Sequence, residues 1–477
     1  MKSDRLKKIA IWLLYLLPVV FFAICYFLIT ATEEDIAQGA GTTPDAWGDL
    51  VAGFRYNARL SDMYAWAVIN FFDYQYSFGV DTIFRLLDLA AVVGVLLLLA
   101  SVILGHRPRA ELKDALVFMG CFLLLVLTPY GYTLYRGFSM IHNYLIISLA
   151  LLGFSFPFIR KLAGGEIPKL YRKWWVAIPM GLVFGMSANF PPLAFLATYA
   201  VVKIWQIFKI SRASRASRAG KRDYAQVRPE AWEIMMIGGM LATMVVGYVF
   251  GPGLSNYASD PMYVTVYDYV PFGEIFQNFG GSVARIFKHM VSNFARVLVP
   301  VVAVLVGGII VALVRAKRMG KKVEWLPKDK GLRGLLAVLA VFGMFSVLAG
   351  SQIIMPVRLC LPAYLALLVA TVILIRTWWQ GLGARGLGVT TVLMILAAVA
   401  AITIRTVFAW DFHERVGEAL AMIRDSEESE VCVNQEELQH RPKMPFGMFQ
   451  QEETFVLRQK NKYVIYGKDV VYCSYSE

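Results

Sequence analysis

Three consecutive acidic residues, Glu33, Glu34 and Asp35, follow the first long apolar segment of the chain. Carboxylates beside a membrane-spanning helix are costly in contact with lipid, so they should face water, a cavity or a cation. A carboxylate held there can remove the proton from an attacking hydroxyl group. We therefore treat these three residues as candidate catalytic residues, while a solvated loop start is the simpler explanation of the same sequence.

Arginine and aromatic residues alternate later in the same polar segment, from Phe54 to Tyr64. A guanidinium group can hold two phosphate oxygens at once, and aromatic rings stack on the faces of sugars. Arg55 and Arg59 are therefore candidate substrate-binding residues. The alternative is an amphipathic helix at the membrane interface, where aromatic residues are common.

Further polar residues stand at the ends of apolar segments and should lie at the membrane level of the acidic cluster. Arg85 and Asp88 are three residues apart on one helix face, so they can pair with each other. A single histidine at an interface is more often structural than catalytic. The convergence of these residues nevertheless predicts a binding surface, to which we also assign Arg136, His142, Asn143, Asn189 and Arg358.

The chain that positions these residues is unusually apolar, with 58% hydrophobic and 17% charged residues. A soluble domain usually carries about 25% charged residues. Apolar stretches close to the length that crosses a bilayer recur along the sequence and predict about eleven spanning helices. They cover residues 9–29, 86–104, 116–130, 141–159, 174–186, 193–208, 234–250, 297–314, 335–349, 359–375 and 389–407. The predicted fold class is an all-α polytopic membrane protein.

The polar stretches divide the chain into a membrane domain over residues 1–407 and a small α/β tail over residues 408–477. The membrane domain carries two outer loops, over residues 31–84 and 251–294. A break containing Pro191 and Pro192 should separate the fifth and sixth spans. A basic repeat at residues 211–220 is expected to be a flexible loop, and an interfacial helix is expected at residues 272–290.

The charge distribution predicts the orientation of these helices. Well over half of the 47 Lys and Arg residues fall in segments that share one side of the membrane if the N-terminus is cytoplasmic. Cytoplasmic loops retain such residues, so we expect the N-terminus inside and the C-terminal tail outside the inner (plasma) membrane of a bacterium. The net charge of +13 is then a result of topology and does not indicate nucleic-acid binding.

The five cysteines fall into two groups. Cys25, Cys121 and Cys360 lie in apolar segments and are expected to be inert packing residues. Cys432 and Cys473 lie in the polar tail, where an oxidising compartment would allow a disulfide between them. Two free thiols are the competing interpretation.

Several short motifs resemble those of the GT-C class of membrane glycosyltransferases, and in particular bacterial families that modify surface polysaccharide with glucose. An acidic pair follows the first helix in those families, and Glu34-Asp35 matches it here, although Asp-Asp is commoner. The other similar segments are Asn57-Ala58-Arg59, His142-Asn143-Tyr144 at the start of the fourth span, Pro252-Gly253, and Pro356-Val357-Arg358.

The resemblance implies inverting transfer of a sugar from a polyprenyl-phosphate donor to a cell-surface glycan or lipid acceptor. Glu34 or Asp35 would be the base, and Arg59 and Arg358 would hold the phosphate. Because the chain has no Walker motif and no Rossmann fingerprint, nucleotide-driven reactions have no support. We expect no cofactor and no metal site, with a divalent metal at the acidic cluster as the alternative.

Two other functions fit the same sequence. A transporter or flippase of a lipid-linked glycan would use the outer arginines without needing a base, although the chain shows no duplicated halves. A polysaccharide polymerase or ligase would also join lipid-linked sugars. Consumption of a labelled polyprenyl-phosphate sugar would separate a transferase from a flippase.

Overall fold

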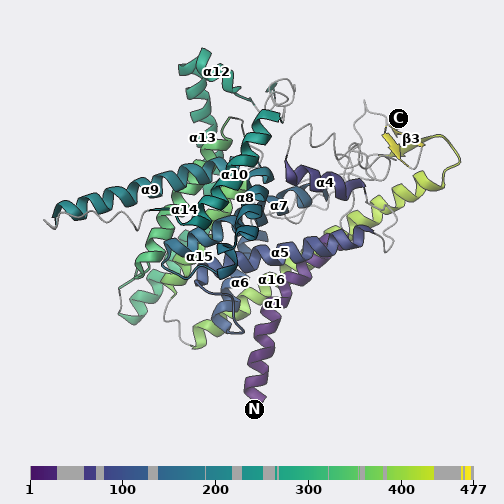
Figure 1. Cartoon of the computed structure of the whole chain (residues 1–477). Helices are drawn as coiled ribbons and strands as arrows, with labels where there is room; N and C mark the ends of the chain where they lie inside the picture. The colour runs from purple at the N-terminus through teal and green to yellow at the C-terminus, as the bar shows by residue number, and fades with distance from the viewer. Residues whose placement is uncertain are drawn as a thin grey trace.

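The structure is a computed structural model. It describes residues 2–28, 59–70, 80–126, 138–188, 190–216, 228–250, 264–265, 268–320, 322–352, 354, 360–379, 384–434, 463–465 and 468–473. Within these ranges the chain is almost entirely helical (Figure 1).

Each of the apolar segments predicted to span the membrane overlaps a described helix. Length and apolarity favour this result, since a helix satisfies all of its backbone hydrogen bonds within the segment. These helices are α1 (Lys2–Leu28), α5 (Val80–Leu104), α6 (Leu112–Val126), α7 (Phe138–Leu162), α8 (Trp174–Ser187), α9 (Phe190–Ala216), α10 (Ala231–Phe250), α13 (Phe279–Met319), α14 (Lys330–Gly350), α15 (Leu361–Trp378) and α16 (Ala384–Asp425). Shorter helices lie between them: α4 (Leu60–Asn70), the 3-10 helix η2 (Lys169–Arg172) and α12 (Phe272–Gln277).

Hydrogen bonds between helix ends show that successive long helices alternate in direction. We call the end of the helical body where α5 finishes the near end, and the end where α1 finishes the far end. At the near end, Arg376 of α15 donates to the carbonyl oxygen of Ile103 in α5. At the far end, Tyr364 of α15 donates to the carbonyl oxygen of Leu124 in α6. α15 therefore runs from the far end to the near end, antiparallel to α6.

The first and last long helices run in the same direction. α1 and α16 pack against each other and rise together towards the C-terminal sheet in Figure 1. The C-terminal part of α1 reaches the far end, where the side chain of Arg85 at the start of α5 donates to the carbonyl oxygen of Tyr26. The described N-terminus and the C-terminal sheet consequently lie on opposite sides of the helical body.

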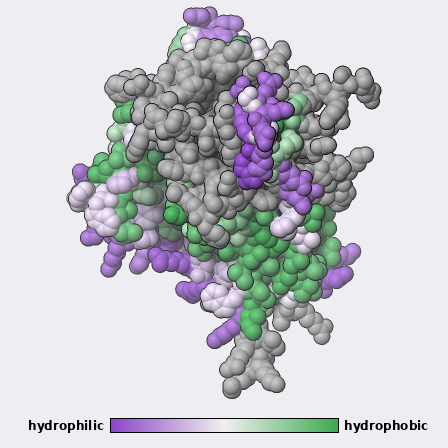
Figure 2. Space-filling model, turned by 90° about the vertical axis from the view of Figure 1, so that its right-hand side faces the viewer, coloured by the Kyte–Doolittle hydropathy of each residue, from purple (hydrophilic) through white to green (hydrophobic). Residues whose placement is uncertain are grey.

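The outer surface of these helices is strongly apolar. Seven of the described helices are long and apolar enough to cross a membrane, and α13 makes an eighth if its two bent halves form one span. α1, α9 and α16 each expose a row of large apolar side chains, which would be unstable in water over such an area. Figure 2 shows part of this surface as a hydrophobic area bordered by hydrophilic residues. The chain is a helical, multi-pass membrane protein.

The shorter apolar helices α8 and α10 form a close pair through glycine. A side chain at Gly181 or Gly185 of α8 would collide with backbone atoms of α10, and one at Gly239 of α10 would collide with the backbone of α8. Such small residues let the backbones of membrane helices approach each other. Thr243 adds a hydrogen bond from its hydroxyl group to the carbonyl oxygen of Leu182.

Two expectations from the sequence need correction, and a third helix is longer than its apolar segment. The expected interfacial helix at residues 272–290 and the eighth span are largely one helix, because α13 extends from Phe279 to Met319, with a bend between Val299 and Val301. The basic repeat is not entirely a flexible loop, because α9 continues to Ala216. The helix α16 continues past the expected boundary at residues 407 and 408 to Asp425, although its apolar span ends at Val407. In each case polar residues ended the apolar run but not the helix.

A small sheet follows α16. The strands β1 (Glu430–Asn434), β2 (Tyr463–Ile465) and β3 (Lys468–Cys473) are arranged in the order β1-β3-β2, with β1 parallel and β2 antiparallel to β3. The Lys468 ammonium group donates to the carbonyl oxygens of Ile423 and Arg424, so it satisfies carbonyls that the end of α16 leaves without partners.

The structure separates the cysteines as the sequence suggested. Cys25, Cys121 and Cys360 are buried thiols outside any disulfide, whereas Cys432 on β1 is disulfide-bonded. Cys473, the remaining cysteine of the sequence, ends the neighbouring strand β3, and its side chain lies outside the described part. The pairing of Cys432 with Cys473 stays a prediction.

Candidate functional site

Two of the residues assigned to substrate binding have described side chains, Arg59 and Asn143. His142 belongs to the first turns of α7, but its side chain lies outside the description. The other candidates are not among the described residues: Glu33, Glu34, Asp35, Arg55, Arg136, Asn189 and Arg358.

Arg59 and Asn143 meet at one carboxylate. Arg59 precedes α4, and its Nη2 atom lies 2.7 Å from Oδ2 of Asp62 in the first turn of that helix. The amide nitrogen of Asn143, from α7, donates to Oδ1 of the same residue. Asn143 is 81 residues from Asp62 in the sequence, so Arg59 and Asn143 bring two distant segments together on one carboxylate at the far end. Both residues are candidates from the sequence analysis, and their role in substrate binding stays a prediction; Asp62 is not among the residues that the sequence analysis selects.

Asn143 leaves one polar atom without a partner. Its amide oxygen is buried and has no hydrogen-bond partner in the part of the chain that the structure describes. Buried polar atoms are usually hydrogen-bonded, and exceptions need an explanation such as a ligand or water. The oxygen can accept a hydrogen bond from a hydroxyl group, which is the group that a sugar offers.

A second set of buried polar groups at the far end ties α4 to α5. Tyr64 of α4 donates its phenolic hydrogen to Asp88 of α5, at 3.0 Å. Burial raises the pKa of Tyr64, and the charge of Asp88 and this hydrogen bond raise it further, so the phenol keeps its proton. Ser61 fixes α4 on its other side by donating to the carbonyl oxygen of Ser187 at the end of α8.

Arg85 occupies the interior beside Asp88. The two residues are 3% and 2% exposed, respectively, and each also bonds to another helix. Arg85 donates to a carbonyl near the end of α1, where a positive charge is favoured by the helix dipole. Charged groups this deep in a membrane protein are rare and mark functional or tightly bonded positions.

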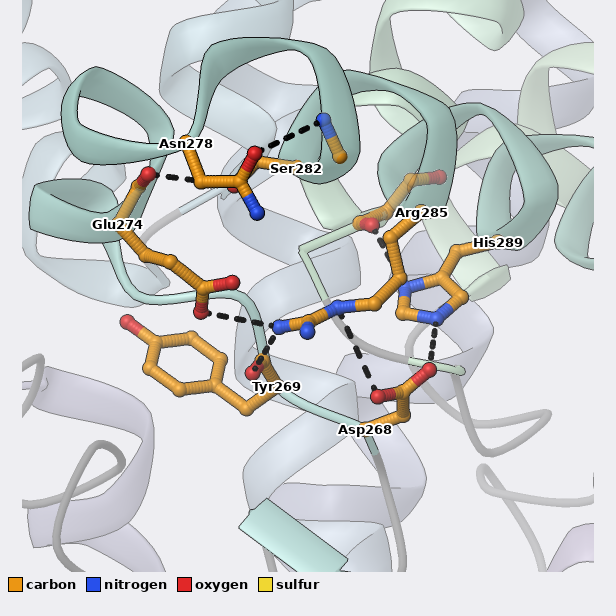
Figure 3. A network of polar contacts seen from close by, with 9 residues as sticks. Asp268, Tyr269, Glu274, Asn278, Ser282, Arg285 and His289 are labelled. Atoms are coloured by element: carbon orange, nitrogen blue, oxygen red, sulfur yellow. Dashed lines mark hydrogen bonds and ion pairs between the residues drawn. The ribbon is translucent and has the colours of Figure 1, made fainter.

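A second far-end cluster surrounds Asp268 (Figure 3). Its carboxylate lies 3.6 Å from Nε of Arg285 and 2.9 Å from Nε2 of His289, both on α13. Arg285 also donates to Glu274 and to the carbonyl oxygen of Tyr269. Asp268 has a positive φ of 47°, a backbone conformation that non-glycine residues adopt at a cost of about 1–3 kcal/mol. The ion pairs therefore hold Asp268 in an unfavourable conformation.

The hydrogen bonds of His289 determine where protons lie in this cluster. Its ring is fully buried, and Nδ1 lies 3.2 Å from the carbonyl oxygen of Ser351. A carbonyl can only accept, so Nδ1 carries a proton. The contact of Nε2 with Asp268 needs a second proton, on either the ring or the carboxyl group. The Asp268 side chain is 38% exposed, so this buried histidine is joined to a carboxyl group at the surface.

Sequence reasoning missed the Asp268 cluster. Arg285 and His289 are four residues apart and share a face of α13, a signal that the expected interfacial helix explained equally well. Asp268 itself lies in a loop, and its contact with α13 depends on tertiary packing. The structure describes no group of three or more His, Cys, Asp or Glu side chains that could hold a metal ion.

Comparisons of the chain with protein-family models, with curated proteins and with solved structures found no match. The chemical interpretation therefore depends on the far-end geometry itself. That end combines the ion pair of Arg59 with Asp62, the buried amide oxygen of Asn143 without a partner among the described residues, and the contact of His289 with Asp268. These groups suit a polar ligand that carries both hydroxyl groups and a negative charge.

Proposed function

We propose that the protein is a membrane glycosyltransferase that moves a sugar from a polyprenyl-phosphate donor to a cell-surface glycan or lipid. The observation that supports this proposal most is the meeting of Arg59 and Asn143 on Asp62. The sequence analysis selects both residues as substrate ligands, and they come from separate segments, since Arg59 precedes α4 and Asn143 lies in α7. A guanidinium group for phosphate and an amide for sugar hydroxyls are what such a donor requires.

The proposed reaction proceeds by direct displacement. The acceptor hydroxyl oxygen attacks the anomeric carbon as the bond from that carbon to the phosphate oxygen breaks, which inverts the configuration. Asp35 or Glu34 takes the hydroxyl proton, a step that typically contributes about a hundred- to ten-thousand-fold. Arg59 and Arg358 stabilise the negative charge that grows on the leaving phosphate.

The proposed topology places this reaction outside the cell. Eleven spans, with the near end in the cytoplasm, put the far-end clusters and the C-terminal sheet on the outer side of the bacterial inner membrane. The strictly alternating helix directions and the basic near-end connections support this arrangement. The donor would then enter from the outer leaflet.

A donor-consumption assay tests the proposal. Membranes containing the protein are given radiolabelled polyprenyl-phosphate glucose, and the label is followed into lipid, polymer and water-soluble fractions. Transfer of the label to an acceptor, absent from membranes without the protein, is the expected result. A donor that stays intact but changes leaflet would identify a flippase. Transfer that needs a preassembled lipid-linked oligosaccharide would identify a polymerase or ligase.

A further inference from the structure

A cavity of about 290 Å³ lies between α7, α9, α14 and α15. Its lining extends from Lys161, in the last turn of α7, to Pro362, in the first turn of α15. Because these two helices run in the same direction, the cavity extends along the helices and not across them. Its volume lies at the lower end of the range of about 300–1,000 Å³ for ligand pockets, which suits a single chain or a small molecule.

The cavity has one long apolar part and one polar end. Leucine and phenylalanine side chains, among them Leu151, Phe342 and Leu365, form most of the wall. An apolar cavity of this kind does not retain water, and inside a bilayer the molecules available to fill it are lipids. On α9, which forms one wall, the neighbouring Ile204 and Trp205 are exposed on the apolar surface.

The polar end lies at the near end of the helical body, around the buried Glu233. The Glu233 carboxylate accepts from Lys161 and from Tyr199, and Nζ of Lys203 lies 3.3 Å away. Lys161 also pairs with Glu230 at 2.8 Å, and that hydrogen bond lowers the pKa of the Glu230 carboxyl group. The two lysines therefore stand at the cavity with their positions fixed.

Two features indicate which head group would fit there. The connections at this end are basic, with Arg160, Lys169, Arg172, Lys173 and Arg228. The amide oxygen of Gln206 lines the cavity, is buried, and has no hydrogen-bond partner among the described residues. Phosphate oxygens would accept from the lysines, and a hydroxyl group would donate to Gln206.

We propose that this cavity is a binding site for one anionic, phosphate-bearing lipid of the near-side leaflet, with a hydrocarbon chain in the apolar part and the phosphate near Lys203. The site is separate from the far-end clusters, and the proposal does not depend on glycosyl transfer. A glycerophospholipid and a polyprenyl phosphate offer the same phosphate chemistry, so the experiment includes both.

Native mass spectrometry of the full-length, delipidated protein tests this site. Phosphatidylglycerol, polyprenyl phosphate and phosphatidylcholine are titrated separately. We expect one bound anionic lipid, and the anionic lipid bound more tightly identifies the source. Lys203→Gln should weaken binding about fivefold, since each lysine near a membrane surface contributes about 1 kcal/mol towards an anionic lipid. Lys209→Gln is the matched control on the same helix, because Lys209 does not line the cavity.

A second variant tests the apolar part independently of charge. Ala366→Phe adds a ring to the cavity wall and should remove the bound lipid, while a monodisperse elution profile and an unchanged melting temperature show that the protein is folded. If this variant fails to fold, Lys203→Gln alone decides. Binding of phosphatidylcholine as tightly as phosphatidylglycerol, or equal loss in the Lys203 and Lys209 variants, would overturn the proposal.

Discussion

The two ends of the helical body each bury a carboxylate among basic side chains, but they use it differently. At the near end, Glu233 is 1% exposed and is held by two lysines and a tyrosine, all from long helices. At the far end, Asp62 is held by Arg59 and Asn143, and the amide oxygen of Asn143 has no hydrogen-bond partner among the described residues.

This difference distinguishes a structural ion-pair cluster, at the near end, from a candidate ligand-binding site, at the far end. A carboxylate on α10 whose partners come from α7 and α9 joins these three helices, because its removal would leave two cations in the interior. The far-end group is built on the short helix α4 and on residues preceding it, where segments that bind ligands are usually found. The number of charges therefore identifies neither end as functional, and each end also buries an amide oxygen without a partner among the described residues, that of Asn143 or of Gln206. The position of Asp62 on a short helix that follows a polar segment is what favours the far end as the candidate catalytic site.

The largest expected effect concerns the side of the membrane on which each end lies. We expect a phosphatase fused after Glu477 to be active only outside the cytoplasm, because the described helices alternate and α16 runs parallel to α1. A fusion after Arg333, at the near end, should be inactive there. A C-terminal fusion that is active only in the cytoplasm would place the far end on the cytoplasmic side of the membrane, which would contradict the proposed reaction on the outer side.

The acidic cluster provides the next test. Either Glu34→Gln or Asp35→Asn should reduce glycosyl transfer by about a hundredfold or more, as expected for loss of a catalytic base. Donor binding should persist, since the arginines are intact. Glu111→Gln changes an exposed carboxylate at the near end and is the control. Full activity in both single variants would show that the base lies elsewhere, and the far-end carboxylate of Asp268 would then be tested first.

The near-end carboxylate should affect stability more than activity. Glu233→Gln leaves Lys161 and Lys203 without a buried counter-charge, so it should reduce the free energy of unfolding by about 3 kcal/mol. The activity per folded molecule should remain. Glu230→Gln is the control, because the Glu230 side chain is 45% exposed and such pairs contribute about 0–1 kcal/mol. Melting temperatures in detergent compare the two. If the Glu233→Gln protein were as stable as the unaltered protein but had lost glycosyl transfer, the structural role that we assign to Glu233 would be wrong.

The sequence was most informative about the helices. Each predicted span coincides with a helix because a long apolar segment in lipid has little alternative to helical structure. The extents were harder to predict: Arg285 and His289 interrupt the apolar pattern of α13 without interrupting the helix. Hydropathy predicts which part of a helix lies in the lipid. The full length of the helix also depends on packing outside the membrane.

The candidate site was predictable in part. Alternation of the spans brings Arg59 and the start of α7 to the same end, so their proximity follows from topology. Asp62 was missed because one aspartate in a polar segment has no distinguishing pattern. The Asp268–His289 contact was missed because it depends on how a loop packs against α13. Sequence can place residues at an end of the helical body, but it cannot say which of them touch.

The smallest expected effect concerns the geometry of Arg59. The Arg59→Lys variant keeps the positive charge but lacks the planar fork, so it should bind donor phosphate less well, by about tenfold. The variant should remain folded, because the new ammonium group can still form a simple ion pair with Asp62. Arg109→Lys, at an exposed near-end position, is the matched control. Binding of a polyprenyl-phosphate sugar in nanodiscs measures the difference. If Arg59→Lys and Arg59→Ala both bound the donor as tightly as the unaltered protein, Arg59 would only hold Asp62 in place. Arg59 and Asp62 at the far end would then be a structural ion pair, like the lysines and Glu233 at the near end.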